Sequence, residues 1–263
     1  MIADGARELI LIGQDTTSYG ADIGYQPGLA GLLRTLDAAC DGARWLRLMY
    51  AYPSVFTTEM IDALAECGRV VKYVDLPLQH INERMLKLMG RRVTRARTEA
   101  LLGELRRRIP GATIRTTFIV GFPGETEAEF EELVAFVRDF GFDAVGAFAY
   151  SAEPDTPAGR MDQQVDEAVK RARYDGLMQA QREVALAAGR RQIGTLFDVV
   201  VDTRERDRCI ARHAGQAPEV DAVCVLPHAR LKPGELVTVR CMAAEGYDLV
   251  AQPEGPPAVS RGG

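Results

Sequence analysis

Polar or glycine-bearing segments directly follow four apolar runs of the chain, and they hold the residue types best suited to chemistry. They are residues 14–20 (QDTTSYG), 78–80 (LQH), 121–126 (GFPGET) and 150–156 (YSAEPDT). If each apolar run is a strand of one parallel sheet, the carboxyl ends of the strands meet at a single edge, where α/β enzymes build their active sites. The four segments therefore predict a shared binding site at that edge, although they do not identify a reaction.

Each segment also has a purely structural interpretation when it is taken alone. The sequence GET at residues 124–126 is typical of a turn followed by a helix start, with Thr126 as the N-cap and acidic residues in the first turn. The glycines of this segment would also allow a backbone to approach a ligand closely. A single histidine such as His80 is more often a structural residue than a ligand, and Asp15 and Asp75 are candidates to cap loops.

The apolar runs that precede these segments have the composition of strands that are buried on both faces. We expect strands at residues 8–13, 45–50, 71–78, 113–121 and 142–150. Helices with an apolar face every 3.6 residues are expected between them, at residues 28–40, 58–67, 97–109 and 127–140. Repeated strand–helix units indicate parallel connections, so the sequence predicts either an α/β barrel or a doubly wound sheet.

A long polar helix, expected at residues 166–193, ends the strand–helix units. Its apolar stripe would consist of Val169, Leu177, Met178, Val184 and Ala188. Beyond a boundary near residues 190–195, short β-like runs separated by polar turns predict a small β-barrel of the OB kind. The expected strands of this barrel are residues 196–202, 209–213, 221–227, 236–242 and 247–252. The tail, residues 253–263, is rich in proline and glycine and is expected to be disordered.

Bulk composition argues against several classes of protein. The chain has 263 residues, 47% of them hydrophobic and 26% charged, which is typical of a soluble globular protein. A formal net charge of −5 argues against a protein that binds nucleic acid through a positive overall charge. No apolar run approaches the roughly 20 residues that a membrane-spanning helix needs, so we expect a cytoplasmic protein with no membrane partner. The five cysteines are too scattered for a metal motif and are expected to be reduced, buried thiols.

Four consecutive stretches resemble signatures of the methylthiotransferase branch of the radical S-adenosylmethionine (SAM) enzymes. They are ELILIGQDTTSYG, YVDLPLQHINERMLKLMGRR, RTTFIVGFPGETEAEFEEL and GAFAYSAEPDTPA. The pairs Gln14-Asp15 and Gln79-His80 resemble the RimO-type subgroup, which modifies a ribosomal protein. Members that modify tRNA more typically read GQNVNSYG and QSGS at these places. The final domain, with its APEVD and YDL sequences, is similar to the TRAM module that closes such proteins.

The resemblance implies an incomplete radical SAM (βα) barrel over residues 1–189 and an OB-like TRAM barrel over residues 190–252. Family members bind SAM and carry two 4Fe–4S clusters, one on a CxxxCxxC loop after the first barrel strand and one in an N-terminal domain. Neither set of cysteines is found in this sequence. We therefore expect no metal ligand, no certain catalytic residue and no activity from the chain alone. Because Met1 falls where the family has the interior of a helix, an N-terminally truncated fragment is expected rather than a naturally short paralogue.

The resemblance also implies where the cofactor would lie. The residues that it places around SAM are Gln79, His80, Arg115, Thr117, Gly121, Phe122, Pro123, Gly124, Glu125, Tyr150 and Ser151. Gln14 and Asp15 are candidates for the side of the site that meets the substrate. Strand alternation would put Arg115 and Thr117 on one face of the sheet, with the Arg115 guanidinium available to a carboxylate.

The function that the resemblance implies is methylthiolation of the β-carbon of an aspartate in the twelfth protein of the small ribosomal subunit. A tRNA (adenosine) methylthiotransferase fragment and a non-catalytic TRAM binding module are the alternatives. Residues 190–253 contain nine Lys and Arg and nine Asp and Glu, with Phe197 and Tyr247 as their aromatic residues. This balance of charge and shortage of rings favour a ribosomal protein over RNA as the partner of the barrel, although RNA binding stays open.

Overall fold

The computed structural model describes residues 2–255. The chain divides into two compact units, of which the first is residues 8–185 and the second comprises residue 186 onward together with the first seven residues. Among the residues described, no helix is both long enough and apolar enough to cross a membrane.

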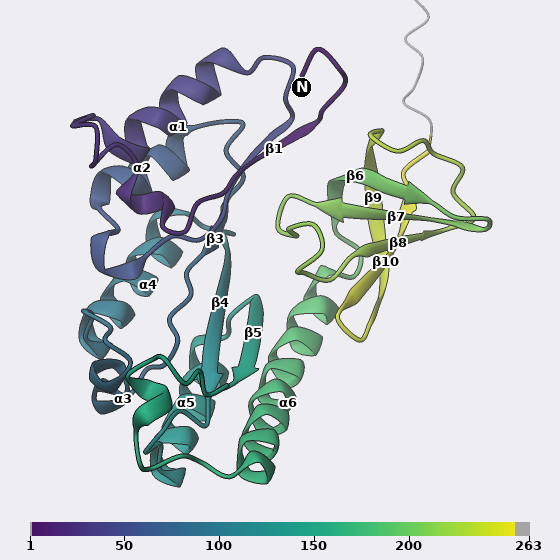
Figure 1. Cartoon of the computed structure of the whole chain (residues 1–263). Helices are drawn as coiled ribbons and strands as arrows, with labels where there is room; N and C mark the ends of the chain where they lie inside the picture. Colours follow the sequence, from purple (N-terminus) through teal and green to yellow (C-terminus); the bar gives the residue numbers. More distant parts are fainter. Residues whose placement is uncertain (1, 256–263) are drawn as a thin grey trace, which may run out of the picture. The chain divides into compact units, whose positions relative to one another are not determined.

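The first unit contains five parallel strands in two sets (Figure 1). They are β1 (Glu8–Leu11), β2 (Trp45–Leu48), β3 (Tyr73–Asp75), β4 (Thr113–Val120) and β5 (Ala144–Ala149). β1 pairs with β2, while β4 pairs with both β3 and β5. A parallel bridge between Leu46 and Val70 joins the two sets. The expected α/β architecture is confirmed, and each of the four polar segments begins after its strand has ended.

Helices alternate with the strands along the chain, as expected. They are α1 (Gly28–Ala39), α2 (Thr58–Glu66), α3 (Glu83–Leu88), α4 (Arg95–Arg108) and α5 (Glu127–Phe140), with 3₁₀ turns η1 (Thr16–Ser18), η2 (Pro53–Val55) and η3 (Ala158–Arg160). The side chains of Thr57, Thr94 and Thr126 cap α2, α4 and α5 by accepting a hydrogen bond from an amide of the first turn. The sequence did not predict α3, which is too short to show a helical period and begins at the side-chain cap Asn82.

The core of the first unit includes an aromatic layer between the sheet and α5. Phe118 of β4 is fully buried, and its ring centroid lies 5.9 Å from that of Phe142 in an edge-on contact. Phe142 also packs on Phe136 of α5, with 5.6 Å between centroids, beside the buried Leu133 and Val137. Burial of side chains of this size stabilises the fold by roughly 1.5–3 kcal/mol each. This apolar layer therefore holds β4 in place. The opposite face of β4 is polar.

Helix α6 (Glu167–Gln192) departs from the apolar stripe that the sequence predicts. Val169, expected on that stripe, is 39% exposed, whereas Lys170, Arg173 and Gln181 are buried. The prediction was wrong at the start of the helix. The buried face begins at Lys170, one residue after Val169, and its first side chains are long and polar. Leu177, which belongs to both patterns, is fully buried.

The second unit contains a closed barrel of five short strands, as expected. The strands are β6 (Leu196–Arg204), β7 (Arg208–His213), β8 (Cys224–Pro227), β9 (Leu236–Glu245) and β10 (Asp248–Pro253). Their order around the barrel is β10-β8-β7-β6-β9. β8 and β10 pair in parallel, and the other neighbours are antiparallel. The last strand reaches Pro253, and residues 256–263 of the tail that was expected to be disordered lie outside the described residues.

Three cysteines belong to the core of the barrel. Cys209, Cys224 and Cys241 are buried there among valine, alanine and leucine side chains. Burial raises the pKa of the Cys224 thiol to about 12 and also raises that of Cys241, because a thiolate would be poorly solvated inside the barrel. Cys40 and Cys67 of the first unit are buried and unpaired as well. The cysteines are therefore free, buried thiols, as the sequence predicts.

Candidate functional site

Polar side chains from neighbouring strands meet on the face of the sheet opposite the phenylalanine layer. Nη1 of Arg115 donates to Oδ1 of Asp75 at 2.9 Å and to Oγ1 of Thr117 at 3.3 Å. Gly146 of β5 pairs with Thr117, and a Cβ at Gly146 would lie 3.4 Å from both Arg115 Nη2 and Thr117 Oγ1. Arg115 and Thr117 thus share one face, as strand alternation predicts. Because Gly146 has no side chain, the polar atoms of these two residues can lie beside it.

Asp75 is the buried acceptor that orients Arg115. Its second oxygen, Oδ2, accepts a hydrogen bond from the backbone amide of Tyr50 at 3.1 Å. The Asp75 side chain has no exposed surface, and that of Arg115 is 13% exposed. Arg115 was expected beside the cofactor with its guanidinium available to a carboxylate. In this structure the guanidinium binds Asp75.

A second buried ion pair lies on the same face, toward the start of the strands. Nε of Arg47 donates to Oε1 of Glu8 at 2.6 Å, and the guanidinium lies 4.6 Å from the ring centroid of Tyr73. Tyr73 is two residues before Asp75 on β3 and therefore points to the same face. Neither charged residue was predicted from the sequence, because both belong to apolar runs. The single arginine within WLRLMY was the signal that could have revealed the pair.

Two residues that follow β2 and β3 have left-handed backbone conformations. The φ angle is +57° at Tyr50 and +69° at Gln79. Residues with a side chain adopt this conformation at a cost on the order of 1–2 kcal/mol. Gln79 is held in it because its amide donates to the Thr117 carbonyl and its carbonyl accepts from the Ile119 amide, both at 2.8 Å. Such strain clusters at functional sites, which supports the carboxyl edge of the sheet as the candidate site.

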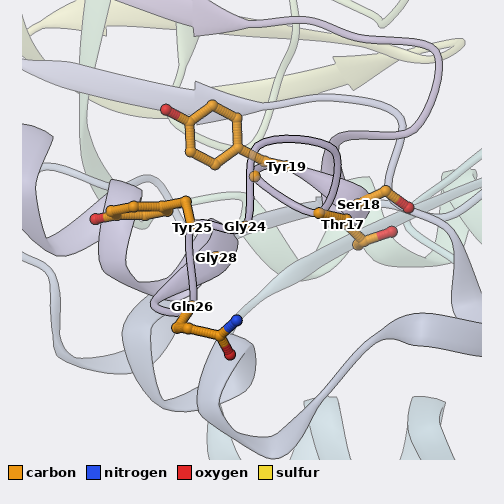
Figure 2. A pocket seen from close by; sticks show the side chains of 9 residues that line it. Thr17, Ser18, Tyr19, Gly24, Tyr25, Gln26 and Gly28 are labelled. Atoms are coloured by element: carbon orange, nitrogen blue, oxygen red, sulfur yellow. The ribbon is translucent and has the colours of Figure 1, made fainter.

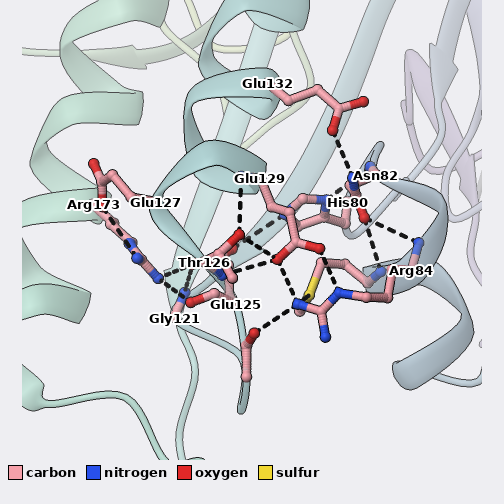
Figure 3. A network of polar contacts seen from close by, with 12 residues as sticks. His80, Asn82, Arg84, Gly121, Glu125, Thr126, Glu127, Glu129, Glu132 and Arg173 are labelled. Atoms are coloured by element: carbon pink, nitrogen blue, oxygen red, sulfur yellow. Dashed lines mark hydrogen bonds and ion pairs between the residues drawn. The ribbon is translucent and has the colours of Figure 1, made fainter.

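Glu125 is the centre of a buried network that holds the loop of residues 121–125 closed (Figure 3). Its Oε1 lies 3.1 Å from His80 Nε2. Its Oε2 accepts from the Gly121 amide and from Arg173 Nη1, both at 2.7 Å. The side chains of His80 and Glu125 have no exposed surface. The fold thus brings these two candidates together, and Arg173 of α6 joins them.

The backbone assigns the tautomer of His80. The amide of Asn82 donates to His80 Nδ1 at 3.0 Å. Nδ1 therefore acts as an acceptor, and the ring proton is assigned to Nε2, from which it is donated to Glu125. A neutral imidazole in this position serves as a fixed donor to the buried carboxylate. The contact favours the structural interpretation of His80 that the sequence left open.

A further ion pair fixes the start of α5 beside the same loop. Arg84 donates from Nε and Nη2 to the two carboxylate oxygens of Glu129, both at 2.6 Å, and Nη2 also donates to the Gly124 carbonyl at 2.7 Å. Thr126 caps α5, as the sequence predicts, and Glu129 completes a reciprocal capping box with it. The hydrogen bond from Arg84 is the main reason that the pKa of Glu129 is lowered to about 2.

The Arg84–Glu129 pair should make stability depend on pH. The pKa of Glu129 is lowered from 4.5 to about 2, so the contribution of the pair is complete above pH 4.5 and is lost as the pH falls through about 2. Because Arg84 is half exposed, we expect Glu129→Gln to lower the free energy of unfolding at pH 7 by only about 1–2 kcal/mol. Urea unfolding between pH 7 and pH 3 should show this difference shrink. A difference that stays constant over the range would contradict the coupling.

Tyr150 follows β5 and packs beside the same loop. Its ring centroid lies 5.1 Å from that of Phe122, and Nζ of Lys170 lies 5.4 Å from it. The hydroxyl of Tyr150 is buried and has no hydrogen-bond partner among the described residues. A buried hydroxyl is costly unless a ligand or water supplies a partner, so Tyr150 has a polar group suited to a bound molecule.

The other candidates are distributed between the loop and the surface. They are Phe122 and Pro123, which are buried, Gly124, which is half-buried, and Ser151 and Gln14, which are exposed. Asp15 caps η1, because Oδ1 accepts from the Thr17 amide at 3.0 Å and Oδ2 accepts from Ser18 Oγ at 2.5 Å. The Asp15 carboxylate therefore orders its own loop, whereas Gln14 lies exposed at the same edge of the sheet.

Two polar residues of α6 belong to the site but were not predicted from the sequence. Arg173 reaches Glu125, and the side chain of Lys170 passes over Gly121, where a Cβ would lie 2.4 Å from Lys170 Cγ. The spacing of residues 170, 173 and 177 could have revealed them, because it places both residues on one helical face with the buried Leu177. Charged residues at the first two positions concealed it.

No group of three or more His, Cys, Asp or Glu side chains is placed to hold a metal ion in the part of the chain that the structure describes. An iron–sulfur cluster needs thiolates that converge on one point. The five cysteines are instead buried in two separate units. The described residues therefore do not fit a cluster.

Both units of the chain are similar to known protein families. Residues 1–137 match the Radical SAM superfamily, and residues 193–253 match the TRAM domain. The chain is 44% identical over 253 residues to the ribosomal protein uS12 methylthiotransferase RimO of Desulforudis audaxviator and 40% identical over 260 residues to that of Bdellovibrio bacteriovorus. Each comparison covers 96% of this chain, which spans 56% and 57% of these two relatives.

Solved structures show a likeness in fold. Coproporphyrinogen III oxidase (HemN) from Escherichia coli, described as a radical SAM enzyme, aligns with a TM-score of 0.51 at 16% identity. The alignment covers 90% of this chain and 54% of that enzyme.

Proposed function

Because this chain belongs to the radical SAM superfamily, we propose that it provides the SAM-binding edge and the TRAM barrel of a methylthiotransferase that acts on ribosomal protein uS12. The superfamily match covers residues 1–137, and RimO proteins resemble the chain over 96% of its length. The chain spans little more than half the length of those relatives, so the activity is proposed for the whole protein.

The observation that carries this proposal is the loop of residues 121–125 beside Tyr150. Glu125 holds the loop closed, and Gly121 and Gly124 have φ angles of +69° and +80°. The Lys170 side chain fills the space beside Gly121, so the loop is held in this left-handed turn next to Tyr150. The buried Tyr150 hydroxyl has no partner among the described residues, so it can bond a polar group of that ligand. These features suit SAM, which has a polar adenosine end and a charged amino-acid end.

In this proposal the chain binds and orients SAM and shields it from water. The contacts would come from Gln79, Arg115 and Thr117 on the sheet, from residues 121–125, and from Tyr150 and Ser151 after β5. When it is bound at a cluster, SAM supplies the radical and the methyl group of the reaction. The resemblance implies two 4Fe–4S clusters in the whole enzyme. Since the described residues do not fit a cluster, we assign no step to one and expect the chain alone to be inactive.

We further propose that the whole enzyme methylthiolates the β-carbon of an aspartate of uS12. Deleting the complete gene should remove the methylthio group from that aspartate and leave tRNA nucleosides unchanged, as mass spectrometry of uS12 peptides and of digested tRNA would show. Complementation with the complete gene should restore the group. Loss of a methylthioadenosine with uS12 unaffected would establish the tRNA-modifying alternative. No change in either molecule would favour the non-catalytic binding module.

We assign a ribosomal protein rather than RNA as the partner of the TRAM barrel. Residues 190–253 carry equal numbers of acidic and basic residues, which is a poor match to a phosphate backbone. Phe197 packs edge-on against His213, with 5.2 Å between ring centroids, and so contributes to the barrel itself. Tyr247 is then the exposed aromatic side chain of the described barrel, whereas platforms for single-stranded RNA use several rings.

A further inference from the structure

A hollow of about 230 Å³ lies in the loop between β1 and α1 (Figure 2). It is lined by residues 17–21, residues 24–26 and Gly28. None of the candidate cofactor residues lines it. The loop is anchored at the carboxyl end of β2, because the Thr16 amide donates to the Tyr50 carbonyl at 3.1 Å and the Tyr52 amide donates to Thr17 Oγ1 at 3.2 Å. The hollow therefore lies at the same edge of the sheet as the candidate site.

Two tyrosines form one corner of this hollow. The ring centroids of Tyr19 and Tyr25 are 6.0 Å apart with 76° between the ring planes, and both rings project to the same side of the loop in Figure 2. The two residues are 43% and 38% exposed, and Ile23 in the same loop is 73% exposed. Accessible aromatic rings beside an apolar side chain are typical of a binding surface. We call this feature the Tyr19–Tyr25 corner.

Glycine and backbone hydrogen bonds set the shape of the corner. Gly20 has a φ angle of +83°, and a Cβ there would lie 2.9 Å from Tyr25 Cβ. Only glycine at this position lets the Tyr25 side chain pack against the turn. The Tyr25 amide donates to the Gly20 carbonyl at 2.8 Å, and the Gly28 amide donates to the Tyr25 carbonyl at 3.0 Å. These bonds order Tyr25 before a partner binds, which reduces the entropy cost of binding.

The charge of the loop favours a cationic occupant. Residues 9–33 contain no Lys, Arg or His but include Asp15 and Asp22, and Asp22 is exposed. The next basic residue along the chain, Arg34, pairs with Glu66 at 3.2 Å. A loop with this charge gives no support to a phosphate group, so an RNA backbone is disfavoured. By contrast, the faces of aromatic rings attract the ammonium of lysine and, more often, the guanidinium of arginine.

We propose that the Tyr19–Tyr25 corner binds a lysine or arginine side chain of the protein substrate. Binding there would determine which stretch of the substrate reaches the carboxyl edge of the sheet. The choice of a protein as the occupant rests on the proposed function, in which the substrate is a ribosomal protein. The charge of residues 9–33 and the two exposed rings support a cationic side chain independently of that function.

Small probes added to the full 263-residue chain test the chemistry of the corner. The probe is N-acetylarginine amide, and the matched neutral control is N-acetylcitrulline amide, with ring signals of labelled tyrosines followed by NMR. We expect the arginine probe to shift the signals of both Tyr19 and Tyr25 saturably, while the citrulline probe and adenosine monophosphate do not. Equal shifts with citrulline would overturn selection for a cation. A response to adenosine monophosphate alone would indicate nucleotide stacking and would also overturn the proposal.

Binding of uS12 to variants of the full chain tests the occupant. Tyr19→Leu and Tyr25→Leu should each weaken binding about tenfold, because each removes one cation–π contact. Tyr19→Phe and Tyr25→Phe should bind within about twofold of the unmodified chain, since the ring is kept. Tyr174→Leu, at an exposed tyrosine of α6, is the matched control and should bind normally. Thermal melting of each variant checks that it is folded.

The outcomes separate this inference from the proposed function. Unchanged uS12 affinity in both leucine variants would overturn the inference and leave the proposed function standing. Failure of the unmodified chain to bind uS12, with its response to the arginine probe intact, would overturn the assigned occupant. The proposed function belongs to the whole protein and is tested separately by deletion of the complete gene.

Discussion

Replacing Glu125 with alanine is expected to lower the free energy of unfolding by about 3–5 kcal/mol, as is usual when a buried ion pair loses one partner. The change would leave the Gly121 amide, His80 Nε2 and the Arg173 guanidinium without the acceptor that they share inside the protein. Urea unfolding at neutral pH, followed by circular dichroism, measures the loss. The loop of residues 121–125 should also open, which hydrogen exchange at the Gly121 amide would detect.

Glu127→Ala is the matched control for this change. Glu127 binds the same arginine, with 3.1 Å between Arg173 Nη2 and Glu127 Oε2, but its side chain is 67% exposed. An exposed pair of this kind contributes no more than about 1 kcal/mol. If Glu125→Ala cost no more than Glu127→Ala, the buried network would not be what stabilises the loop.

Replacing Gly121 with alanine is expected to cost about 2–5 kcal/mol of stability, because it adds backbone strain to a steric clash. The φ angle of Gly121 is +69°, and a Cβ there would lie 2.4 Å from Lys170 Cγ and 3.4 Å from Lys170 Cα. The Lys170 side chain would have to move. Thermal and urea unfolding of the variant measure the cost.

Gly111→Ala separates the two causes. Gly111 has a φ angle of +78°, and a Cβ there would meet nothing within 4 Å, so the substitution should cost only about 1–2 kcal/mol from strain. The double variant Gly121→Ala with Lys170→Ala should recover part of the loss in a double-mutant cycle. Equal losses at Gly121 and Gly111 would show that contact with Lys170 carries no cost.

The strands of the first unit and the barrel of the second could be predicted because both depend on local patterns. Strands covered on both faces need continuous apolar runs, and short barrel strands need turns at regular intervals. Helix α6 shows where local patterns fail. Its buried Arg173 pairs with Glu125, 48 residues earlier, and its buried Lys170 lies in space that Gly121 leaves open. A helical period reveals a buried face only when that face is apolar.

The segments of the candidate site could be named from the sequence, but the contacts between their residues could not. His80 and Glu125 were placed on separate segments that should converge, and they lie 3.1 Å apart. The pair between Arg115 and Asp75 was not expected, because it depends on the strand register that places the two residues side by side. The Tyr19–Tyr25 corner was not expected, because the left-handed turn that brings the rings together is a property of the backbone.

The five buried thiols make unfolding visible without any added probe. A thiol-reactive reagent can modify Cys209, Cys224 and Cys241 only when the barrel opens, and Cys40 and Cys67 only when the first unit opens. Peptide mass spectrometry after timed labelling would therefore assign an opening rate to each unit. The native cysteines can in this way report whether a substitution in the loop of residues 121–125 loosens the whole chain or the sheet alone.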